Sequence, residues 1–473
     1  MLLSVNLMAQ IKRVPPPARV YPVPSEAQLT WAEMEMNAFV HFNINTFTDK
    51  EWGYGDESPE LFNPTHTDVN QWAKTLHETG FKQLILTCKH HDGFCLWPTK
   101  YSDRSIKQSP YKSGKGDIVR EVRDAAKKYG LRFGVYLSPW DRNRADYGKP
   151  SYINYYRNQL KELFMQYGPV FEMWFDGANG GDGYYGGANE KRTINGAVYY
   201  KWPATLNLVR KMEPNILFFS DAGPGVRWVG NERGIAGTTN WNTITTDTLY
   251  AGKPGIENLL NTGTEDGKQW VPAEVDVSIR PGWFYHARED SLVKTPEQLM
   301  EIYLSSVGRG STLLLNIPPD RTGRFHPNDV KALYGFKVLL KKELGRNLAA
   351  HATVSAGNTR GDQRQFAPAN ITDGNKETYW AANDDVISTS IEIKMPKPAT
   401  VKYILLQEYI KLGQRVKAFD VEVWKYNGWQ KVAEATTIGY KRILKIIPVK
   451  TGKIRVTIRD TKACPVISNI EVY

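Results

Sequence analysis

The feature that most constrains the fold is a regular alternation of short apolar runs with longer amphipathic segments between residues 31 and 344. Several runs are rich in Val, Ile, Leu and Phe without strict alternation, as expected of strands that are buried on both faces. The segments between them have helical spacing; in one, Ile118, Val122 and Ala125 share a stripe and Gly130 follows as a stop signal. Repeated strand–helix units predict an α/β domain with a parallel sheet.

The number of these units favours a closed sheet. Strands are predicted at residues 37–42, 83–87, 133–137, 172–175, 216–219, 274–277 and 312–316. Six or seven consecutive units are more typical of a (β/α)8-like barrel than of an open sheet. The stretch 226–267 has little helical periodicity, so the count of units stays open there. We therefore predict an N-terminal segment over residues 1–30 and a (β/α)8-like catalytic domain over residues 31–345.

The pattern changes over residues 346–473. Runs of β-branched and aromatic residues at 401–407, 418–426, 443–449 and 453–458 are separated by turn residues. Val421-Glu-Val-Trp424 alternates strictly, and Tyr426-Asn-Gly428 is a hairpin signal. No segment here has a clear helical pattern. We predict an all-β jelly-roll sandwich as the C-terminal domain.

Charge and hydropathy exclude two classes of partner. The chain has 61 Lys and Arg against 50 Asp and Glu, a net charge of +11, but the basic residues are scattered. A nucleic-acid binder usually clusters them, so we expect no nucleic-acid partner. No run of about 18 apolar residues is present, so we expect no membrane span.

The cysteines and the first ten residues bear on the compartment. Cys88, Cys95 and Cys464 form neither a disulfide framework nor a zinc pattern. Residues 1–10 resemble the end of a signal peptide, with a small residue near a cleavage point but without a charged n-region. We expect an exported protein, periplasmic or secreted; the alternative is an unstructured N-terminus.

Polar and aromatic residues gather at the carboxyl ends of the predicted barrel strands, where the reacting groups of such barrels lie. Asp176 leaves an apolar strand directly into a glycine turn. Flat aromatic rings suit the apolar faces of sugars. Together the strand ends predict one pocket for a polar, hydroxyl-rich ring. Its other candidate residues are His41, His90, His91, Asp92, Tyr136, Asp221, Arg227, Trp228, Glu232, Arg280 and Trp283.

Three functions are compatible with such a pocket. His90, His91, Asp92 and Asp176 suggest a metal-dependent hydrolase, although adjacent histidines do not readily point at one ion. Glycoside hydrolysis requires two carboxylates flanking the scissile bond, and Asp176 suits the nucleophile. A lectin-like barrel would keep the aromatic rings without needing the carboxylate pair.

Four motifs then carry a family resemblance. They are His41-Phe-Asn43 with Glu51-Trp52, Lys89-His-His-Asp-Gly-Phe94, Trp174-Phe-Asp-Gly177 and Leu313-Leu-Leu-Asn-Ile-Pro-Pro-Asp320. In this order, over residues 36–344, the chain resembles glycoside hydrolase family 29, the α-L-fucosidases. The resemblance implies a fucosylated oligosaccharide or glycoconjugate substrate. It also implies a retaining mechanism through a fucosyl-enzyme ester, with no required cofactor and no metal.

The resemblance also implies roles for individual residues. Asp176 matches the nucleophile. The residues that match those holding the fucose hydroxyls are His41, Glu51, Trp52, His90, His91 and Tyr136. We add Trp174, Arg227 and Trp283 to this substrate-binding set because they belong to the same motifs and strand ends.

The acid/base residue has no shared position across this family. The stretch Ser220 to Glu232 resembles the branch that removes α-1,3/1,4-linked fucose from branched, Lewis-type glycans, which implies Glu232 as acid/base. The rivals are Glu274 and Glu289. A Gly/Tyr-rich insertion at residues 179–188 departs from the expected pattern and leaves the aglycone preference open. A fucosidase of broad specificity is the alternative.

The C-terminal domain has a resemblance of its own. Ala367-Pro-Ala-Asn-Ile-Thr-Asp-Gly374 and Thr378-Tyr-Trp380 resemble the discoidin-like sandwiches that follow many glycosidase barrels. Some of these bind sugars or a structural calcium ion. The alternative is a scaffold without a ligand.

Overall fold

The structure, a computed structural model, describes residues 13–473 and divides into two compact units. One unit spans Pro24–Arg346. The other comprises Asn347–Tyr473 together with the described residues before Pro24. The signal-like residues 1–10 lie outside the described part of the chain, so export stays a prediction.

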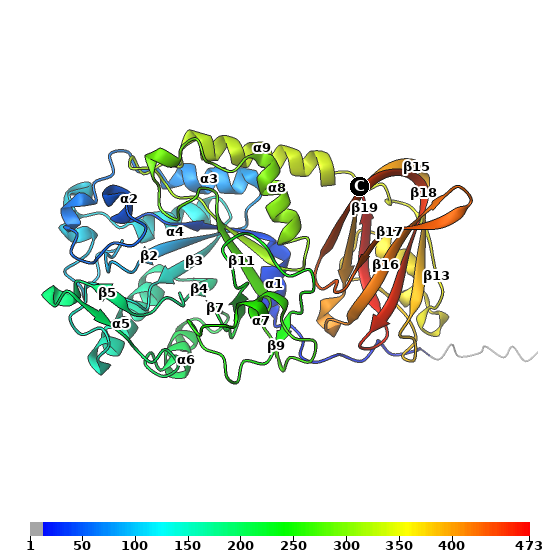
Figure 1. Cartoon of the computed structure of the whole chain (residues 1–473), viewed down its shortest axis with the longest axis horizontal. Coiled ribbons are helices and arrows are strands. Elements are labelled where there is room, and N and C mark those ends of the chain that lie inside the picture. The colour runs from blue at the N-terminus through cyan, green and yellow to red at the C-terminus, as the bar shows by residue number, and fades with distance from the viewer. Residues whose placement is uncertain (1–12) are drawn as a thin grey trace, which may run out of the picture. The chain divides into compact units, whose positions relative to one another are not determined.

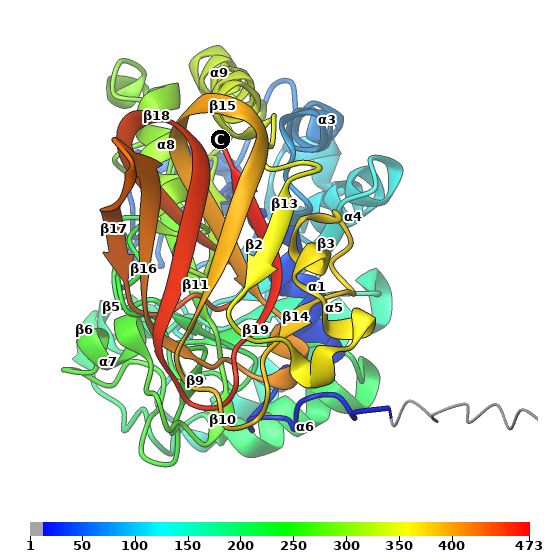
Figure 2. The same ribbon diagram turned by 90° about the vertical axis from the view of Figure 1, so that its right-hand side faces the viewer.

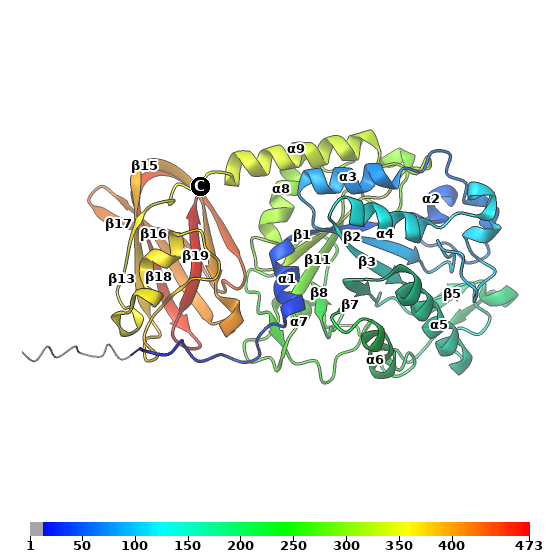
Figure 3. The same ribbon diagram turned by 180° about the vertical axis from the view of Figure 1, so that it is seen from behind.

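The first unit is built on a closed barrel of parallel strands, which confirms the predicted fold class (Figure 3). Each of the seven predicted strands overlaps an observed one. The eighth, β8, lies in the stretch without helical periodicity and is only three residues long, too short to give a sequence signal. The barrel strands are β1 (Met36–Val40), β2 (Gln83–Lys89), β3 (Arg132–Leu137), β4 (Glu172–Trp174), β7 (Leu217–Ser220), β8 (Val226–Trp228), β11 (Ala273–Ser278) and β12 (Thr312–Asn316).

Helices surround the barrel strands (Figure 1). Their ends follow the sequence signals: the Asp117 carboxylate caps α4 by accepting the Arg120 N–H at 3.0 Å, and Gly80 ends α3 with a φ of 98°. The α-helices are α1 (Glu26–Met34), α2 (Asn45–Thr48), α3 (Val69–Thr79), α4 (Ile118–Lys128), α5 (Pro150–Tyr167), α6 (Trp202–Met212), α7 (Glu257–Thr262), α8 (Pro296–Ser305) and α9 (Pro327–Leu344).

Two small antiparallel sheets are separate from the barrel sheet. The Gly/Tyr-rich insertion forms one of them, a hairpin of β5 (Gly181–Gly183) and β6 (Glu190–Arg192). The other pairs β9 (Thr243–Ile244) with β10 (Gln269–Trp270). Short 3₁₀ turns of the barrel unit are η1 (Pro59–Leu61), η2 (Ile106–Gln108), η3 (Tyr111–Gly114), η4 (Tyr185–Gly187) and η5 (Ala287–Glu289).

The C-terminal unit is an antiparallel β-sandwich, as predicted (Figure 2). The predicted strands at 443–449 and 453–458 are one continuous strand, β18, because it pairs along its length with β15 through register shifts rather than a chain reversal. Its strands are β13 (Thr353–Ala356), β14 (Trp380–Ala381), β15 (Thr389–Glu408), β16 (Val416–Lys425), β17 (Gly428–Ala435), β18 (Arg442–Thr461) and β19 (Val466–Val472), and its 3₁₀ turns are η6 (Arg360–Asp362), η7 (Arg364–Phe366), η8 (Pro368–Thr372) and η9 (Ile410–Leu412).

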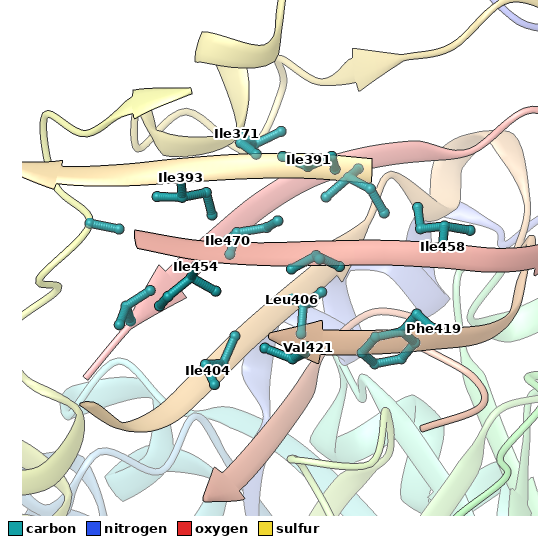
Figure 4. Packing of buried hydrophobic residues seen from close by; sticks show 14 of the residues in the cluster. Ile371, Ile391, Ile393, Ile404, Leu406, Phe419, Val421, Ile454, Ile458 and Ile470 are labelled. Carbon is teal, nitrogen blue, oxygen red and sulfur yellow. The ribbon is translucent and has the colours of Figure 1, made fainter. Parts of the chain in front are cut away.

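Local chemistry sets the sandwich hairpin and its core. Tyr426 and Asn427 both have positive φ, 50° and 61°, so the predicted turn between β16 and β17 has the conformation of a tight hairpin. The core is almost entirely aliphatic, and Ile391, Ile393 and Ile454 are completely buried in it (Figure 4). Burial of such side chains is the main favourable term in folding this unit.

The structure divides the predicted segment 1–30 differently from the sequence. Residues 14–20 hydrogen-bond to the sandwich: the Arg360 guanidinium donates to the Pro15 carbonyl at 2.7 Å, and the Val20 N–H donates to the Leu412 carbonyl at 2.9 Å. Arg415 donates to the Ala18 carbonyl. Residues 24–30 instead belong to the barrel unit, where α1 begins at Glu26.

Candidate active site

A cavity of about 430 Å³ opens at the carboxyl ends of the barrel strands. Eleven residues were assigned a catalytic or substrate-binding role from the sequence. The cavity brings together nine of them and leaves out Glu51 and Arg227. A concave pocket with several convergent polar groups is the usual form of a small-molecule site. Its lining consists of Phe39, His41, Trp52, His90, His91, Tyr136, Trp174, Asp176, Gly177, Ala178, Asn179, Asp221, Trp228, Glu232, Gly252, Asp276 and Trp283.

Asp176 is held in the cavity from two sides. The Tyr136 hydroxyl donates to its Oδ2 at 2.9 Å, and the Ala178 N–H donates to its Oδ1 at 2.7 Å. The next residue must be glycine, since a Cβ on Gly177 would lie 2.0 Å from Oδ2 of Asp221. The Asp176 side chain remains 24% exposed. It is therefore an oriented carboxylate that faces open space, as a nucleophile requires.

The proton of His41 is located by its neighbours. The Asn316 amide donates to Ser278 Oγ and to the Trp283 carbonyl, so its Oδ1 is the atom 2.8 Å from His41 Nδ1 and must accept from it. Burial lowers the pKa of His41 to about 3. The ring is neutral at pH 7, with an unprotonated Nε2 that can accept a hydroxyl hydrogen.

His91 has the same arrangement. The Ser138 hydroxyl donates to the Trp140 carbonyl at 2.6 Å, so it accepts from His91 Nδ1 at 2.7 Å. Burial lowers the pKa of His91 to about 4. Its Nε2 lies 3.8 Å from Oδ2 of Asp176, outside direct hydrogen-bonding distance. A second neutral acceptor thus stands beside the nucleophile candidate.

His90 differs from both. It is buried, its ring centroid is 4.0 Å from that of His91, and its Nδ1 has no hydrogen-bond partner among residues 13–473. Burial lowers the pKa of His90 well below its usual value. His90 lines the cavity, but this nitrogen is itself buried, and an unsatisfied buried polar atom is destabilising.

Four tryptophans lie in the lining, Trp228 and three others that present flat surfaces near the histidines and Glu232. Trp174 stacks on Phe219 with ring centroids 3.8 Å apart, and its Nε1–H donates to Glu274 at 3.0 Å. Trp52 is 53% exposed at the rim and meets His91 edge to face. Trp283 donates its Nε1–H to the Glu232 carboxyl at 3.2 Å. Such rings suit the apolar face of a sugar.

Glu232 is the second carboxyl group that suits catalysis. It lies on the loop after β8, at the exposed rim of the cavity, with its carboxyl against Trp283. Partial withdrawal from water raises the pKa of Glu232, and the nearby charge of Asp176 raises it further. A carboxyl with a raised pKa in the same cavity as an oriented carboxylate is the arrangement that general acid catalysis requires.

The prediction for Arg227 is wrong. Its guanidinium is completely buried away from the cavity and donates to the backbone carbonyls of Leu260 and Trp241, at 2.8 and 2.9 Å. Successive side chains on a strand point to opposite faces. On β8 this alternation places Trp228, not Arg227, in the cavity.

Glu51 does not line the cavity; its carboxylate accepts hydrogen bonds from the backbone of the Trp283 segment. Its Oε2 accepts the Trp283 N–H at 2.8 Å, and its Oε1 accepts the Phe284 N–H at 3.2 Å and lies 2.6 Å from His286 Nε2. In this structure Glu51 therefore orients the Trp283 segment. The prediction that it lines the pocket is corrected accordingly, because its carboxylate is engaged by that segment.

The two rivals of Glu232 lie elsewhere. Glu274 is buried behind the lining, where Trp31 and Trp174 donate to its two oxygens. Glu289 is buried and accepts the Gly282 N–H at 3.1 Å. Neither lines the cavity.

Two further acids lie in the lining: Asp221, which the sequence named as a pocket candidate without a role, and Asp276, which it missed. Asp221 directly follows β7 and accepts the Gly252 N–H at 2.7 Å; burial raises its pKa to about 7. Asp276 lies inside β11 and accepts the Trp228 Nε1–H at 2.9 Å; burial raises its pKa well above the usual range. Counting by twos from Glu274 along β11 is the signal that could have found Asp276.

The metal-site alternative receives no geometric support. The two oxygens of Asp92 accept the Phe94 N–H and the Asn43 amide, both at 2.8 Å, so this carboxylate is engaged by its own loop and by the loop after β1. Within residues 13–473, no three His, Cys, Asp or Glu side chains are placed to hold one metal ion. Metal independence stays a prediction that chelation can test.

Comparisons with known proteins agree with this geometry. Residues 19–343 match the alpha-L-fucosidase family, and residues 352–471 match the F5/8 type C domain. Alpha-L-fucosidase 1 of Arabidopsis thaliana is 39% identical over 464 residues, which are 97% of this chain and 89% of that protein.

Solved structures show the same two-part architecture. A glycoside hydrolase 29 family member from an unknown rumen bacterium is 45% identical with a TM-score of 0.86, over 97% of this chain and 78% of that one. A GH29 fucosidase of Ruminococcus gnavus in complex with fucose is 33% identical with a TM-score of 0.87, over 98% and 97% of the two chains.

Proposed function

The chain belongs to the α-L-fucosidase family and has that family's activity, and from this premise we propose that it is a retaining exo-α-L-fucosidase that removes α-1,3/1,4-linked fucose from branched, Lewis-type glycans. The observation that carries the mechanism is that Asp176 and Glu232 line one cavity, the first oriented by two donors and the second with a raised pKa. Retaining glycosidases use a pair of carboxyl groups in these two states.

The first step forms a covalent intermediate. The Asp176 carboxylate attacks the anomeric carbon of fucose and forms an ester bond as the glycosidic C–O bond breaks. Glu232 gives its proton to the departing glycosidic oxygen, so the glycan leaves as an alcohol. Tyr136, which donates to Oδ2 of Asp176, stabilises the carboxylate when it leaves in the second step.

The second step returns both groups to their starting state. Glu232, now ionised, takes a proton from water as the water oxygen attacks the anomeric carbon. The ester bond breaks and Asp176 leaves as a carboxylate. Two inversions at one carbon give fucose with retained configuration.

The neutral histidines account for recognition of hydroxyl groups. His41 and His91 each keep one ring nitrogen free to accept, because Asn316 and Ser138 take the proton on the other. These sites suit sugar hydroxyls, and the tryptophans suit the apolar face that carries the fucose methyl group.

The linkage preference is supported by the resemblance of residues 220–232 to the α-1,3/1,4 branch, since Glu232 is the matching residue. The cavity rim beside it includes Asn179 from the Gly/Tyr-rich insertion, a place where a branched leaving group would contact the protein. A fucosidase of broad specificity is the second candidate. The lectin-like alternative does not account for two carboxyl groups in one cavity, one oriented by two donors and the other with a raised pKa.

Further proposals concern the compartment and the sandwich. We propose an exported protein, on the signal-like residues 1–10. None of the helices in residues 13–473 has the length and hydropathy needed to span a membrane.

Sugar binding by the sandwich is also a proposal, and so is a structural calcium ion there. In this structure the two oxygens of Asp373 accept hydrogen bonds from the Asn375 N–H and the Thr378 hydroxyl of its own loop.

Two measurements test the proposal. Proton NMR of an aryl α-L-fucoside during hydrolysis should show α-L-fucose first; β-L-fucose first would overturn the retaining mechanism. Initial rates on a Lewis-type trisaccharide, a 2-fucosylated chain and the aryl fucoside should show a kcat/KM at least about tenfold higher for the Lewis-type glycan than for the 2-fucosylated chain. Equal rates would support the broad-specificity alternative.

A further inference from the structure

Two buried glutamates face each other in the barrel interior, behind the lining of the active site. Glu172 comes from β4 and Glu274 from β11, and both are completely buried. Neither lines the cavity, and the proposed chemistry uses neither. Burying two acids together is strongly unfavourable unless hydrogen bonds satisfy them and a proton is shared.

Glu274 accepts from two tryptophans at once. Trp174 Nε1–H donates to its Oε1 at 3.0 Å, and Trp31 Nε1–H donates to its Oε2 at 3.1 Å. Indole is a donor only, so both oxygens of Glu274 must act as acceptors in these two bonds. Only a carboxyl group supplies an acceptor on both terminal atoms.

Glu172 is the second acid of the pair. The Gln83 amide donates to its Oε2 at 3.0 Å, and its Oε1 has no hydrogen-bond partner among residues 13–473. Burial raises the pKa of Glu172 well above its usual value, and the charge of Glu274 raises it further. Burial raises the pKa of Glu274 to about 7.

Trp174 connects this pair of glutamates to the active site. Its ring lines the cavity, stacks on Phe219 at 3.8 Å, and precedes Asp176 by two residues on the same chain segment. Stacking fixes the plane of the ring, and the Nε1–H bond to Glu274 fixes its rotation within that plane. Trp31 receives the same support but does not line the cavity.

We propose that Glu274 is a positioning residue of the fucosidase reaction: by accepting from Trp174 it fixes the ring against which the sugar is placed for attack by Asp176. The inference rests on the proposed function, because it takes the cavity as the fucose site. Glu172 is hydrogen-bonded to Gln83 and to neither tryptophan, so it has no direct part in fixing the ring.

The decisive comparison is between two isosteric variants. Glu274→Gln turns one acceptor into an NH₂ group that faces an indole N–H, so Trp174 or Trp31 loses its partner. We expect kcat/KM to fall about 10- to 100-fold, the size of effect produced by displacing a substrate-positioning group. Glu172→Gln keeps an acceptor for Gln83 and leaves both tryptophan bonds to Glu274 in place, so its kcat/KM should stay within about threefold of wild type.

Trp31→Phe is the matched control for a purely structural effect. It removes the other N–H donor to the same carboxyl, so it should lower the thermal midpoint while leaving kcat/KM within about threefold. Trp174→Phe should lower kcat/KM about as much as Glu274→Gln. In the double variant the two losses should not add, because both remove the same bond.

Several results would overturn the inference. They are a Glu274→Gln variant with wild-type kcat/KM, a Glu172→Gln variant as impaired as Glu274→Gln, and additive losses in the double variant. If Glu274→Gln does not fold, Trp174→Phe decides alone, and wild-type kinetics there would reject the role. Failure of the proposed function is distinguishable, since it would appear as activity retained in Asp176→Asn.

Discussion

The cavity lining at the carboxyl ends of the barrel strands (the barrel mouth) and the sandwich core bury very different side chains. Around the cavity, His41, His90 and His91 are buried together with Asp276 and Tyr136. The sandwich core is formed by Ile, Val, Leu and Phe, whose burial needs no partner (Figure 4). The barrel mouth is therefore less stabilising to the fold than an apolar core would be. In exchange it presents polar groups that can hydrogen-bond to a sugar.

A buried polar group in the sandwich sharpens this contrast. Glu408 is buried, but its carboxyl accepts the backbone N–H groups of Arg415, Val416 and Gly439 at 2.7 to 2.8 Å. Its bonds are internal, whereas His90 Nδ1 has no partner within the described residues. A buried carboxyl whose hydrogen bonds all come from its own backbone surroundings, such as Glu408, is structural.

The largest expected effect is in the barrel mouth. Asp176→Ala should lower kcat by about 10³-fold or more, because the covalent intermediate can no longer form. The thermal midpoint should change little, since the side chain is partly exposed. The measurement is kcat on an aryl fucoside, and circular dichroism is the folding control. A folded variant with near-normal activity would rule out the covalent mechanism.

Glu232 should show a dependence on the leaving group. Glu232→Ala should lose about 10²- to 10⁴-fold in kcat/KM on a natural glycan, whose oxygen leaves only with a proton. With an activated aryl fucoside the first step should be much less affected, and azide should speed the second step. Equal losses on both substrates, without azide rescue, would move the acid/base role to another residue.

In the sandwich, the same kind of truncation should act on stability and not on catalysis. Ile454→Ala removes a completely buried side chain and should lower the free energy of unfolding of this unit by about 2–5 kcal/mol. Urea unfolding measures the loss. With the protein still folded at 25 °C, kcat/KM on the aryl fucoside should stay near wild type, and a parallel loss of kcat/KM would break the contrast between the two regions.

The pH dependence should separate the acids of the mouth from its histidines. Glu232 must start protonated, so activity on natural glycans should fall as the pH rises through its raised pKa. The pKa values of His41, about 3, and His91, about 4, keep both rings neutral above pH 5, so neither should cause an acidic limb there. In Glu232→Ala the alkaline limb on an aryl fucoside should disappear, and its persistence would assign that limb to another acid.

The smallest expected effect is that of chelation. Prolonged dialysis against EDTA should leave kcat/KM on an aryl fucoside unchanged, because the histidines act as hydrogen-bond acceptors. A loss of activity that zinc or manganese restores would favour the metal-dependent hydrolase. A fall in thermal midpoint alone, reversed by calcium, would instead support a structural ion in the sandwich.

Local sequence signals predicted much of the fold. The apolar runs gave seven of the eight barrel strands, and Tyr426-Asn-Gly428 gave the hairpin of the sandwich. They failed at β8, since three residues are too few for a period to appear, and its pairing with β7 and β11 depends on closure of the barrel. They also failed at β18, where two apparent strands are one.

Local sequence signals were also insufficient to place the single residues of the site. The sequence alone determined that Asp176 leaves an apolar strand into a glycine turn, and that polar residues follow the other strands, because both are matters of chain order. Only the tertiary structure decided that Trp228 and Asp276 enter the cavity, that Arg227 turns away and that Glu51 holds Trp283. The physical reason is that the direction in which a side chain points depends on strand register and on contacts between segments more than two hundred residues apart, which no local pattern encodes.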